Sequence, residues 1–238
     1  MGERIERRAT YEPASREERF IVPLLREAIL AAITTHAPRL RARALDAGCG
    51  EQPFRGALEA AGLDYHSLDI GQNATRTVEF IGALDAELPA GIGVFNLVLC
   101  SEVLEHVEHW DRGLRNLAAL LAPGGRAIVT TPFVYPLHEV PHDHRRATPY
   151  ALIAAAHANG LRVLEERRLG DSWDVLGTVL AATWTYPADA RIGSRALAAA
   201  ARIVHGSLWR FLTSAAMRSR VALRGPWFLS TLVVLERP

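Results

Sequence analysis

The chain has 238 residues, 49% of them hydrophobic, so it can bury one substantial core, and its length favours a single elaborated domain. The formal net charge is +1. A field this weak would not attract a polyanion, so charge gives no support to nucleic acid as a partner.

Charges occupy the N-terminus where a secretory signal would have its apolar core, and no stretch approaches about 20 consecutive apolar residues. Cys49 and Cys100 lie at the ends of apolar, strand-like runs. Buried single cysteines of this kind are typical of reduced thiols in a cytosolic protein. We therefore expect a cytoplasmic location.

An amphipathic helix is the first element that the sequence predicts. Ser15 with Glu18 three residues later resembles a capping box, and apolar residues recur at helical spacing from Phe20 to His36. Short β-rich runs and helical patterns then alternate, which predicts a parallel sheet with helices on both faces. The predicted strands are 42–47, 65–70, 77–81, 95–100, 126–130 and 161–169, and the predicted helices are 53–61, 111–121 and 148–159.

The last part of the chain differs in pattern. From Trp173 to Arg224 the pattern is helical, and residues 227–235 form a final apolar strand. We expect one domain over 1–238, with a helical segment at 1–40, a ligand-binding core at 41–170, a helical cap or insertion at 171–225 and the final strand at 226–238.

The first strand runs into Gly48-Cys49-Gly50 and then into a helix. This is where a doubly wound sheet binds a nucleotide-like ligand at its carboxyl edge. A dinucleotide fingerprint needs a small residue at the third glycine position, where this chain has Pro53. An NAD-dependent short-chain oxidoreductase would also need a Tyr-x-x-x-Lys pair, and the sequence contains no lysine. Both observations argue against an NAD-dependent oxidoreductase.

The loop instead resembles motif I of the class I S-adenosylmethionine (SAM)-dependent methyltransferases, and further motifs follow in register over residues 40–170. They are ALDAELP at 83–89, FNLVLCSEVLEHV at 95–107 and LAPGG at 121–125. Gln52 stands where many members have a third glycine, and Asn96 where many have aspartate. The resemblance implies a Rossmann-like, doubly wound, mostly parallel seven-stranded α/β fold with an N-terminal helix and a C-terminal helical insertion.

The resemblance also implies SAM as cofactor and a set of residues that bind it. Asp69, at the end of the second strand, would accept hydrogen bonds from both ribose hydroxyls, and Asp85 belongs to the loop on the adenine side. The implied cofactor residues are Asp46, Gly48, Cys49, Gly50, Asp69, Ile70, Asp85, Ala86, Ser101 and Glu102.

The acceptor chemistry is expected in the loop that follows the fifth strand. Residues 138–144, HEVPHDH, resemble a segment of a methyltransferase-11-like subgroup that is often linked to glycan, lipid and secondary-metabolite genes. A hydroxyl acceptor needs a general base, for which we favour His142, then His138, with Asp143 as a third catalytic candidate. In the alternative interpretation, His142 and Asp143 only hold the loop in place, and the neighbouring arginines are solvated.

A metal site is the second possibility. Glu102, Glu105 and His106 share one face if their segment is helical, and His142 could complete a site for Mg²⁺ or Mn²⁺ that binds a diol or catechol. The pattern resembles the E-x-x-E-H ligands of small-RNA 2'-O-methyltransferases and ubiquinone-pathway O-methyltransferases. In many relatives that use no metal, the same residues only line the SAM pocket. We therefore favour a general base that acts without a metal.

The segment from Pro187 to Gly225 contains seven arginines and one acidic residue, Asp189, interleaved with apolar residues. Such a helix can lie on an anionic membrane surface, cap an apolar pocket, or pack as an ordinary amphipathic helix. Taken together, the sequence predicts O-methylation of a small-molecule, glycan or lipid-linked acceptor, with S-adenosylhomocysteine (SAH) as by-product. The alternatives are metal-assisted O-methylation and a SAM-binding enzyme that transfers no methyl group, such as a cyclase.

Overall fold

The computed structural model describes residues 9–38, 42–183 and 192–238. Within these residues one seven-stranded sheet has the order β3-β2-β1-β4-β5-β7-β6, in which β7 runs antiparallel to both of its neighbours. The strands are β1 Ala42–Ala47, β2 Leu63–Asp69, β3 Phe80–Ile81, β4 Phe95–Ser101, β5 Leu121–Pro132, β6 Arg162–Leu169 and β7 Ser230–Glu236. The mostly parallel, doubly wound α/β fold predicted from the sequence is confirmed.

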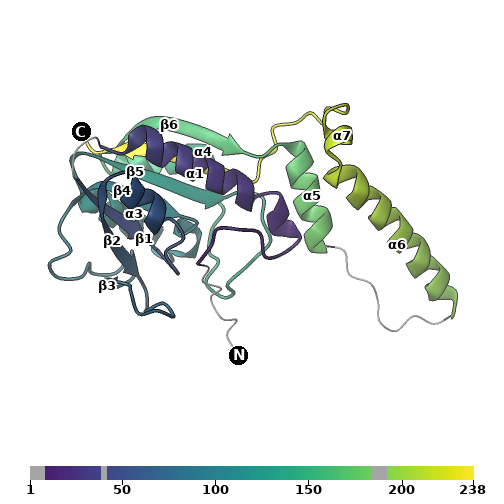
Figure 1. Cartoon of the computed structure of the whole chain (residues 1–238), viewed down its shortest axis with the longest axis horizontal. Helices are drawn as coiled ribbons and strands as arrows, with labels where there is room; N and C mark the ends of the chain where they lie inside the picture. Colours follow the sequence, from purple (N-terminus) through teal and green to yellow (C-terminus); the bar gives the residue numbers. More distant parts are fainter. Residues whose placement is uncertain (1–8, 39–41, 184–191) are drawn as a thin grey trace.

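Helices cover both faces of the sheet (Figure 1). They are α1 Val22–His36 and α2 Arg55–Ala60 on one face, and α3 Trp110–Leu120 and α4 Pro149–Ala158 on the other. Neighbouring strand residues therefore enter different cores: Leu97 faces α1 and α2, whereas Val98 faces α3. Because both faces are covered, the central strands are apolar throughout rather than alternating.

The caps predicted from the sequence form. The hydroxyl of Ser15 accepts from the Glu18 amide at 3.4 Å, and the Glu18 carboxylate accepts from the Ser15 amide at 3.3 Å. This box begins a short 3-10 helix, η1 Glu17–Arg19, and α1 follows at Val22. At α4, Thr148 accepts from the Ala151 amide with Pro149 at the first helical position, as predicted.

The Pro123-Gly124-Gly125 sequence lies inside β5 rather than between α3 and the next strand. Gly124 donates to Arg237 O at 2.7 Å, and Arg237 donates back to Gly125 O at 2.9 Å. The β4–β5 register shifts between Phe95 and Leu97, and a Cβ on Gly125 would lie 2.8 Å from Phe95 O. The glycines thus form an irregularity in a long strand, and sequence reasoning took them for a turn.

A helical arm joins β6 to β7. Its helices are α5 Ser172–Thr183, α6 Ile192–Thr213 and α7 Ala215–Arg218. The Trp173 indole donates to Leu212 O at 2.7 Å, and Arg218 forms ion pairs with Asp171 and Asp174. In Figure 1, α6 stands away from the sheet on the far side of α5. Among the described helices, none is both long and apolar enough to span a membrane.

Candidate active site

A cavity of about 830 Å³ opens at the carboxyl edge of the parallel strands. The β1–α2 loop, the ends of β2 and β4, and the loops at 82–85 and 135–144 line it, and residues 11–25 close one side. Parallel α/β sheets bind ligands at this edge, and the volume is that of a pocket for a cofactor-sized molecule.

The glycine turn lies at the floor of this cavity. The Gly48 amide donates to Leu68 O at 2.7 Å, and Gly48 has a φ of +78°, which favours glycine. A Cβ at this position would lie 2.2 Å from Cγ2 of Val103. Gly48 therefore lets the β1–α2 loop and the segment after β4 approach each other beneath the cavity.

Gln52 stands where many methyltransferases have a third glycine, and its own backbone is left-handed, with φ of +62°, a conformation that favours glycine. Its amide group donates to Thr77 O at 3.0 Å and to the Ser67 hydroxyl at 3.2 Å, and accepts from the Thr77 hydroxyl at 3.1 Å. These hydrogen bonds offset the cost of a side chain in this conformation. A glutamine is therefore accommodated at this position of the loop.

Two strand-end carboxylates flank the turn. Asp69 lies at the end of β2, lines the cavity and accepts from the Gly50 amide at 2.8 Å. Asp46, in β1, accepts from the Tyr65 hydroxyl at 3.2 Å, and burial raises its pKa to about 7. Both residues lie where the sequence resemblance expects cofactor ligands.

The ten residues implied to bind the cofactor fall into two groups. Nine of the ten line the cavity: Asp46, Gly48, Cys49, Gly50, Asp69, Ile70, Asp85, Ser101 and Glu102. Ala86 does not, and its carbonyl instead accepts from the Asn116 side chain at 2.7 Å. Asp85 lines the cavity while its carboxylate accepts from the His109 amide at 2.9 Å, which ties the 82–85 loop to the start of α3.

The lining has a strong excess of acidic residues. Its members are Glu17, Glu18, Asp46, Glu51, Asp69, Asp85, Glu102, Glu108 and Glu139, and no arginine lines the cavity among the described residues. Carboxylates facing a concave, partly desolvated site favour a cationic ligand. SAM carries a sulfonium, and the product SAH does not, so this charge favours the reactant over the product.

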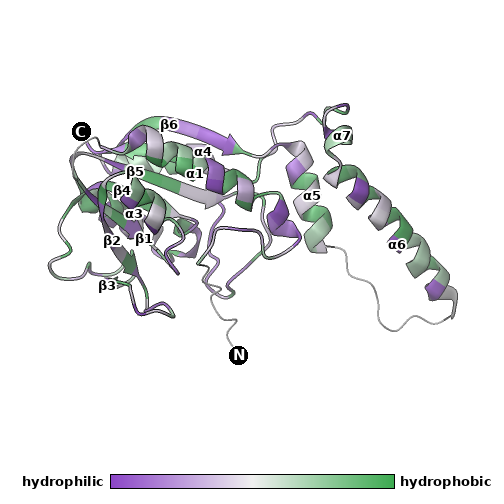
Figure 2. Ribbon diagram, in the orientation of Figure 1, coloured by the Kyte–Doolittle hydropathy of each residue, from purple (hydrophilic) through white to green (hydrophobic). Residues whose placement is uncertain are grey.

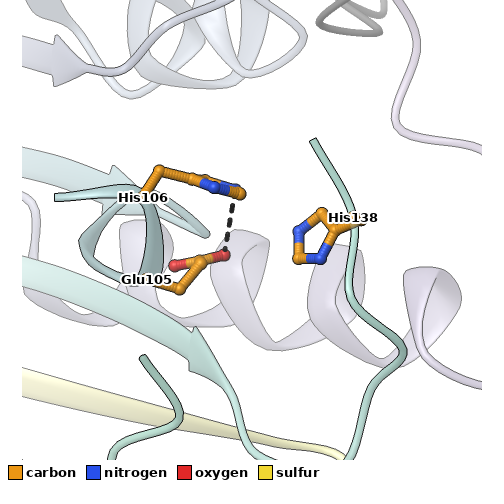
Figure 3. A group of neighbouring side chains, drawn as sticks. All are labelled: Glu105, His106 and His138. Atoms are coloured by element: carbon orange, nitrogen blue, oxygen red, sulfur yellow. Dashed lines mark ion pairs between the residues drawn. The ribbon is translucent and has the colours of Figure 1, made fainter. Parts of the chain in front are cut away.

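Three side chains lie close together where the loop after β5 passes η2: Glu105, His106 and His138 (Figure 3). Ligand atoms of all three lie within 4.8 Å of one another. Glu105 and His106 belong to the short helix η2 Leu104–His106, and His138 belongs to the loop after β5. Figure 3 shows the His138 ring facing the space beside the other two.

Hydrogen bonds fix the tautomers of both imidazoles. Nδ1 of His106 lies 3.0 Å from His142 O, and Nδ1 of His138 lies 3.3 Å from Pro136 O and 3.2 Å from Asp143 Oδ2. Because these oxygens only accept, Nδ1 carries the proton in each ring, and Nε2 of each neutral ring has a lone pair. Burial lowers the pKa of His106, which favours the neutral ring.

The Glu105 side chain is fully buried, and neither carboxylate oxygen has a hydrogen-bond partner among the described residues. Nε2 of His106 lies 3.7 Å from Oε1 of Glu105, too far for a hydrogen bond. Burial, and then the nearby Glu102 carboxylate, raise the pKa of Glu105 well above its ordinary value. Such a group holds a proton or faces a cation that the protein itself does not supply.

Glu102 and His142, which the sequence placed in a possible metal set, turn elsewhere. The Glu102 carboxylate accepts from the Ser230 hydroxyl at 3.1 Å, and burial raises its pKa to about 7. His142 is exposed and lines the cavity, and its carbonyl oxygen accepts from Nδ1 of His106. The structure thus groups His138 with Glu105 and His106, in place of Glu102 and His142.

The loop that contains these histidines is held by a buried ion pair. The Asp143 side chain is 2% exposed and receives two bonds from Arg146. Burial alone would raise the pKa of Asp143, but the hydrogen bonds from Arg146 and from the His138 amide outweigh it, so the pKa is lowered. Asp143 therefore holds both Arg146 and His138, and Arg146 is not a solvated residue.

The N-terminal contribution was missed by sequence reasoning. Tyr11, Ile21, Val22 and Leu25 line the cavity, and Tyr11 contacts Phe54 with ring centroids 4.8 Å apart. The only available signal was the capping box at Ser15, which predicts where a helix begins and says nothing about what it covers.

The fold, the glycine turn and the strand-end acidic residues define a class I methyltransferase site. A sequence profile of the methyltransferase-domain family matches residues 16–187, and the chain belongs to that family. The methyltransferase domain that the sequence resemblance predicts is therefore confirmed. The finer methyltransferase-11-like assignment stays a prediction.

Curated relatives match part of the chain. A ubiquinone biosynthesis O-methyltransferase of Xanthomonas euvesicatoria is 32% identical over 114 residues, which are 42% of this chain and 46% of the relative. One of Caulobacter is 39% identical over 101 residues, which are 37% of this chain and 40% of the relative. The chain thus spans about half the length of the curated relatives it matches.

Solved structures share the fold at low identity. The cyclase SpnF has a TM-score of 0.56 and 15% identity, covering 89% of this chain and 81% of that one. A Burkholderia thailandensis 1,6-didemethyltoxoflavin-N1-methyltransferase, solved with its substrate and SAH, has a TM-score of 0.53 and 15% identity, covering 92% and 79%. These likenesses support the fold alone.

Proposed function

We propose that this methyltransferase transfers the methyl group of SAM to a hydroxyl oxygen of a small-molecule, glycan or lipid-linked acceptor and releases SAH. The observation that carries the proposal is the pair of imidazoles, His106 and His138, whose Nδ1 atoms are both occupied by acceptors. An oxygen acceptor must lose a proton on methylation, and a neutral imidazole Nε2 beside the cavity can take it. The relatives named O-methyltransferases support the same chemistry.

In the proposed step, the acceptor oxygen attacks the methyl carbon in line with the sulfur. The oxygen–carbon bond forms, the carbon–sulfur bond breaks with its electron pair left on sulfur, and the hydroxyl proton moves to Nε2 of His106. His138, held by Asp143, is the second candidate base. In this scheme the carbonyl oxygen of His142 fixes the His106 tautomer, and the His142 ring takes no part in the proton transfer.

SAM fits the cofactor side of the cavity on three grounds: the glycine turn, the Asp69 carboxylate beside it and the acidic lining that suits a sulfonium. Asp69 is the proposed ribose ligand, and Asp46 lies beneath the loop. The bound cofactor supplies the electrophilic methyl group. The protein orients it, excludes water and holds the base.

Methyl-labelled SAM tests the proposal. The full chain would be incubated with labelled SAM and a panel of hydroxyl acceptors that includes catechols, sugars and polyprenyl-linked glycans, and products would be identified by mass spectrometry and NMR. The expected product has a labelled methoxy carbon. A label on nitrogen or carbon contradicts the oxygen acceptor, and product formed without label transfer supports the cyclase-like alternative.

A divalent metal is the second candidate, and one observation favours it. Metal-bound histidines usually donate their second ring N–H to a carbonyl or carboxylate, as His106 and His138 do here, and the buried Glu105 carboxylate lacks a partner among the described residues. Glu105, His106 and His138 would hold the ion, which would lower the pKa of the acceptor hydroxyl.

Metal dependence separates the two candidates. With the metal-free base, EDTA leaves turnover unchanged, and metal analysis of the purified protein finds no stoichiometric ion. With the metal, EDTA abolishes turnover, Mg²⁺ or Mn²⁺ restores it, and Glu105→Gln lowers metal content without changing SAM affinity. We favour the metal-free base. The cytoplasmic location and the division of residues 1–238 as a single domain are further proposals.

A further inference from the structure

We propose that the outer part of the helical arm, which consists of α6, α7 and residues 219–229, docks on an anionic phospholipid membrane surface. This outer part is called the arm below. This inference goes beyond the methyltransferase activity and does not depend on the identity of the acceptor. It rests on an exposed apolar face, a one-sided charge distribution and the position of the arm beside the cavity.

The apolar face belongs to α6. Leu197 is 72% exposed, Val204 52% and Leu208 43%, and these residues recur at the spacing that places them on one side of a helix. Ile203, 69% exposed, points to a different side of the helix. Figure 2 shows the hydrophobic stretch along α6 in the part that stands clear of the sheet.

A different side of α6 faces the protein. Its buried residues, Ala198, His205 and Leu212, recur every seven residues. Near its end, Trp209 contacts Phe20 edge to face at 5.9 Å, and Phe211 lies 5.0 Å from the Trp173 ring. The helix is therefore anchored to α5 and η1 by its buried side and by Trp209 and Phe211 at its C-terminal end, which leaves the apolar face from Leu197 to Leu208 without cover from the described residues.

Charge selects an anionic occupant for this face. Residues 190–235 contain seven arginines and no acidic residue, so the rest of the chain has 20 arginines against 26 acidic residues. The exposed arginines of the described arm are Arg195, Arg202, Arg210, Arg218, Arg220 and Arg224, of which Arg218 is paired with α5. On α6 the arginines lie two positions from Leu197, Val204 and Leu208 and so form the opposite, polar face of the helix. An apolar face with an arginine-rich polar face is the pattern of helices that lie at an anionic bilayer surface.

The same charge disfavours pairing of two arms. Two copies of α6 joined through their apolar faces would bring together two arginine-rich segments with no acidic residue between them. An anionic bilayer can bury Leu197 and Val204 at its acyl-chain boundary. Its phosphates can bind the long arginine side chains that reach the interface.

The arm also lies beside the cavity. It follows β6 and therefore leaves the sheet at the carboxyl edge, where the cavity opens. In Figure 1 the arm extends from that end of the molecule. Docking of this arm would therefore hold the cavity end of the molecule toward the membrane, which suits a lipid-linked acceptor.

Vesicle co-sedimentation of the full chain tests the inference. Phosphatidylcholine vesicles would be compared with vesicles containing phosphatidylglycerol, at low and high salt. We expect binding to the anionic vesicles and its loss at high salt. Arg195→Gln with Arg210→Gln should weaken binding by roughly five-fold per arginine. Arg76→Gln with Arg115→Gln, on the body of the protein, is the matched control and should leave binding unchanged.

A second variant tests the contribution of the apolar face of α6 to vesicle binding. Leu197→Ser with Val204→Ser should reduce binding, whereas Val94→Ser, 45% exposed at the other end of the sheet, should not. Unchanged melting temperature and SAM affinity exclude misfolding, and they also show the cofactor site to be intact whatever the vesicles show. Equal binding to neutral and anionic vesicles overturns the inference. So does a dimer in sedimentation velocity that the Leu197 variant dissociates.

Discussion

The two halves of the cavity are held in different ways. The cofactor half is built from strand ends, and backbone amides of Gly48 and Gly50 are bonded to β2. The acceptor half is a loop, fixed by the Asp143–Arg146 ion pair and by the His144 amide, which donates to Glu105 O at 2.8 Å. A sheet-built half tolerates little change, whereas a loop-built half can vary while the sheet stays the same. We therefore expect a fixed cofactor site and an adaptable acceptor site.

The largest effect is expected in the sheet-built half. Gly48→Ala should abolish measurable SAM binding, because the added Cβ meets Val103 at 2.2 Å. Gly62→Ala is the matched control: Gly62 has a similar φ of +81°, with nothing within 4 Å of an added Cβ. It should lose about 1–2 kcal/mol of stability and keep its SAM affinity. Calorimetry and thermal unfolding measure both, and normal SAM affinity in Gly48→Ala would refute the loop placement.

The next effect tests the loop-built half. His106→Gln should lower kcat by about a hundred-fold to ten-thousand-fold, the usual contribution of a general base, with SAM affinity unchanged. His142→Gln keeps the carbonyl that bonds His106 and removes only an exposed ring, so its kcat should change little. Steady-state kinetics of the two variants decide the point. The reverse order would restore His142 as the base.

Asp69→Asn should weaken SAM binding by about tenfold or more, since a charge-assisted hydrogen bond contributes about 1.5–3 kcal/mol. The control is Asp64→Asn, at the start of the same strand, where the side chain is 70% exposed. Calorimetric titration measures both dissociation constants. If Asp69→Asn loses less than twofold, Asp69 is not the ribose ligand.

The sequence could group the residues of the proposed cofactor half because their determinants are local. A strand, a glycine turn and an acidic residue at the next strand end are read from neighbouring positions, and the structure brings Asp46, Gly48 and Asp69 to one cavity. The capping box and the alternation of strands and helices are local in the same way. Pro123-Gly124-Gly125 is an exception, because pairing with the distant Arg237 decides its conformation.

The acceptor half depends on contacts between distant segments. Residue types predicted a histidine-rich site, but which histidine meets Glu105 depends on the path of the loop after β5, and Asp143 with Arg146 sets that path. The exposed position of His142 and the lining by Tyr11 have no signature in their own neighbourhoods. Sequence reasoning could therefore propose the chemistry without assigning the roles.

The smallest effect concerns pH. Burial raises the pKa of Asp46 to about 7 in the free protein, and a bound cation favours the ionised carboxylate. SAM binding should then release a proton, so SAM affinity should rise with pH below 7, by at most about tenfold per pH unit, and level off above. Asp46→Asn should flatten this dependence.

The stability of the free protein should change in the opposite direction. A carboxyl group with a raised pKa in the folded state stabilises the protein at low pH and loses that contribution as the pH rises through about 7. The melting temperature should therefore fall between pH 5.5 and 8.5 by more in the natural protein than in Asp46→Asn. Glu102, whose pKa is also raised to about 7, lines the same cavity, so Glu102→Gln is the matched variant. If Glu102→Gln, and not Asp46→Asn, removes the pH dependence of SAM binding, the titrating carboxylate is Glu102 and the assignment of Asp46 is wrong.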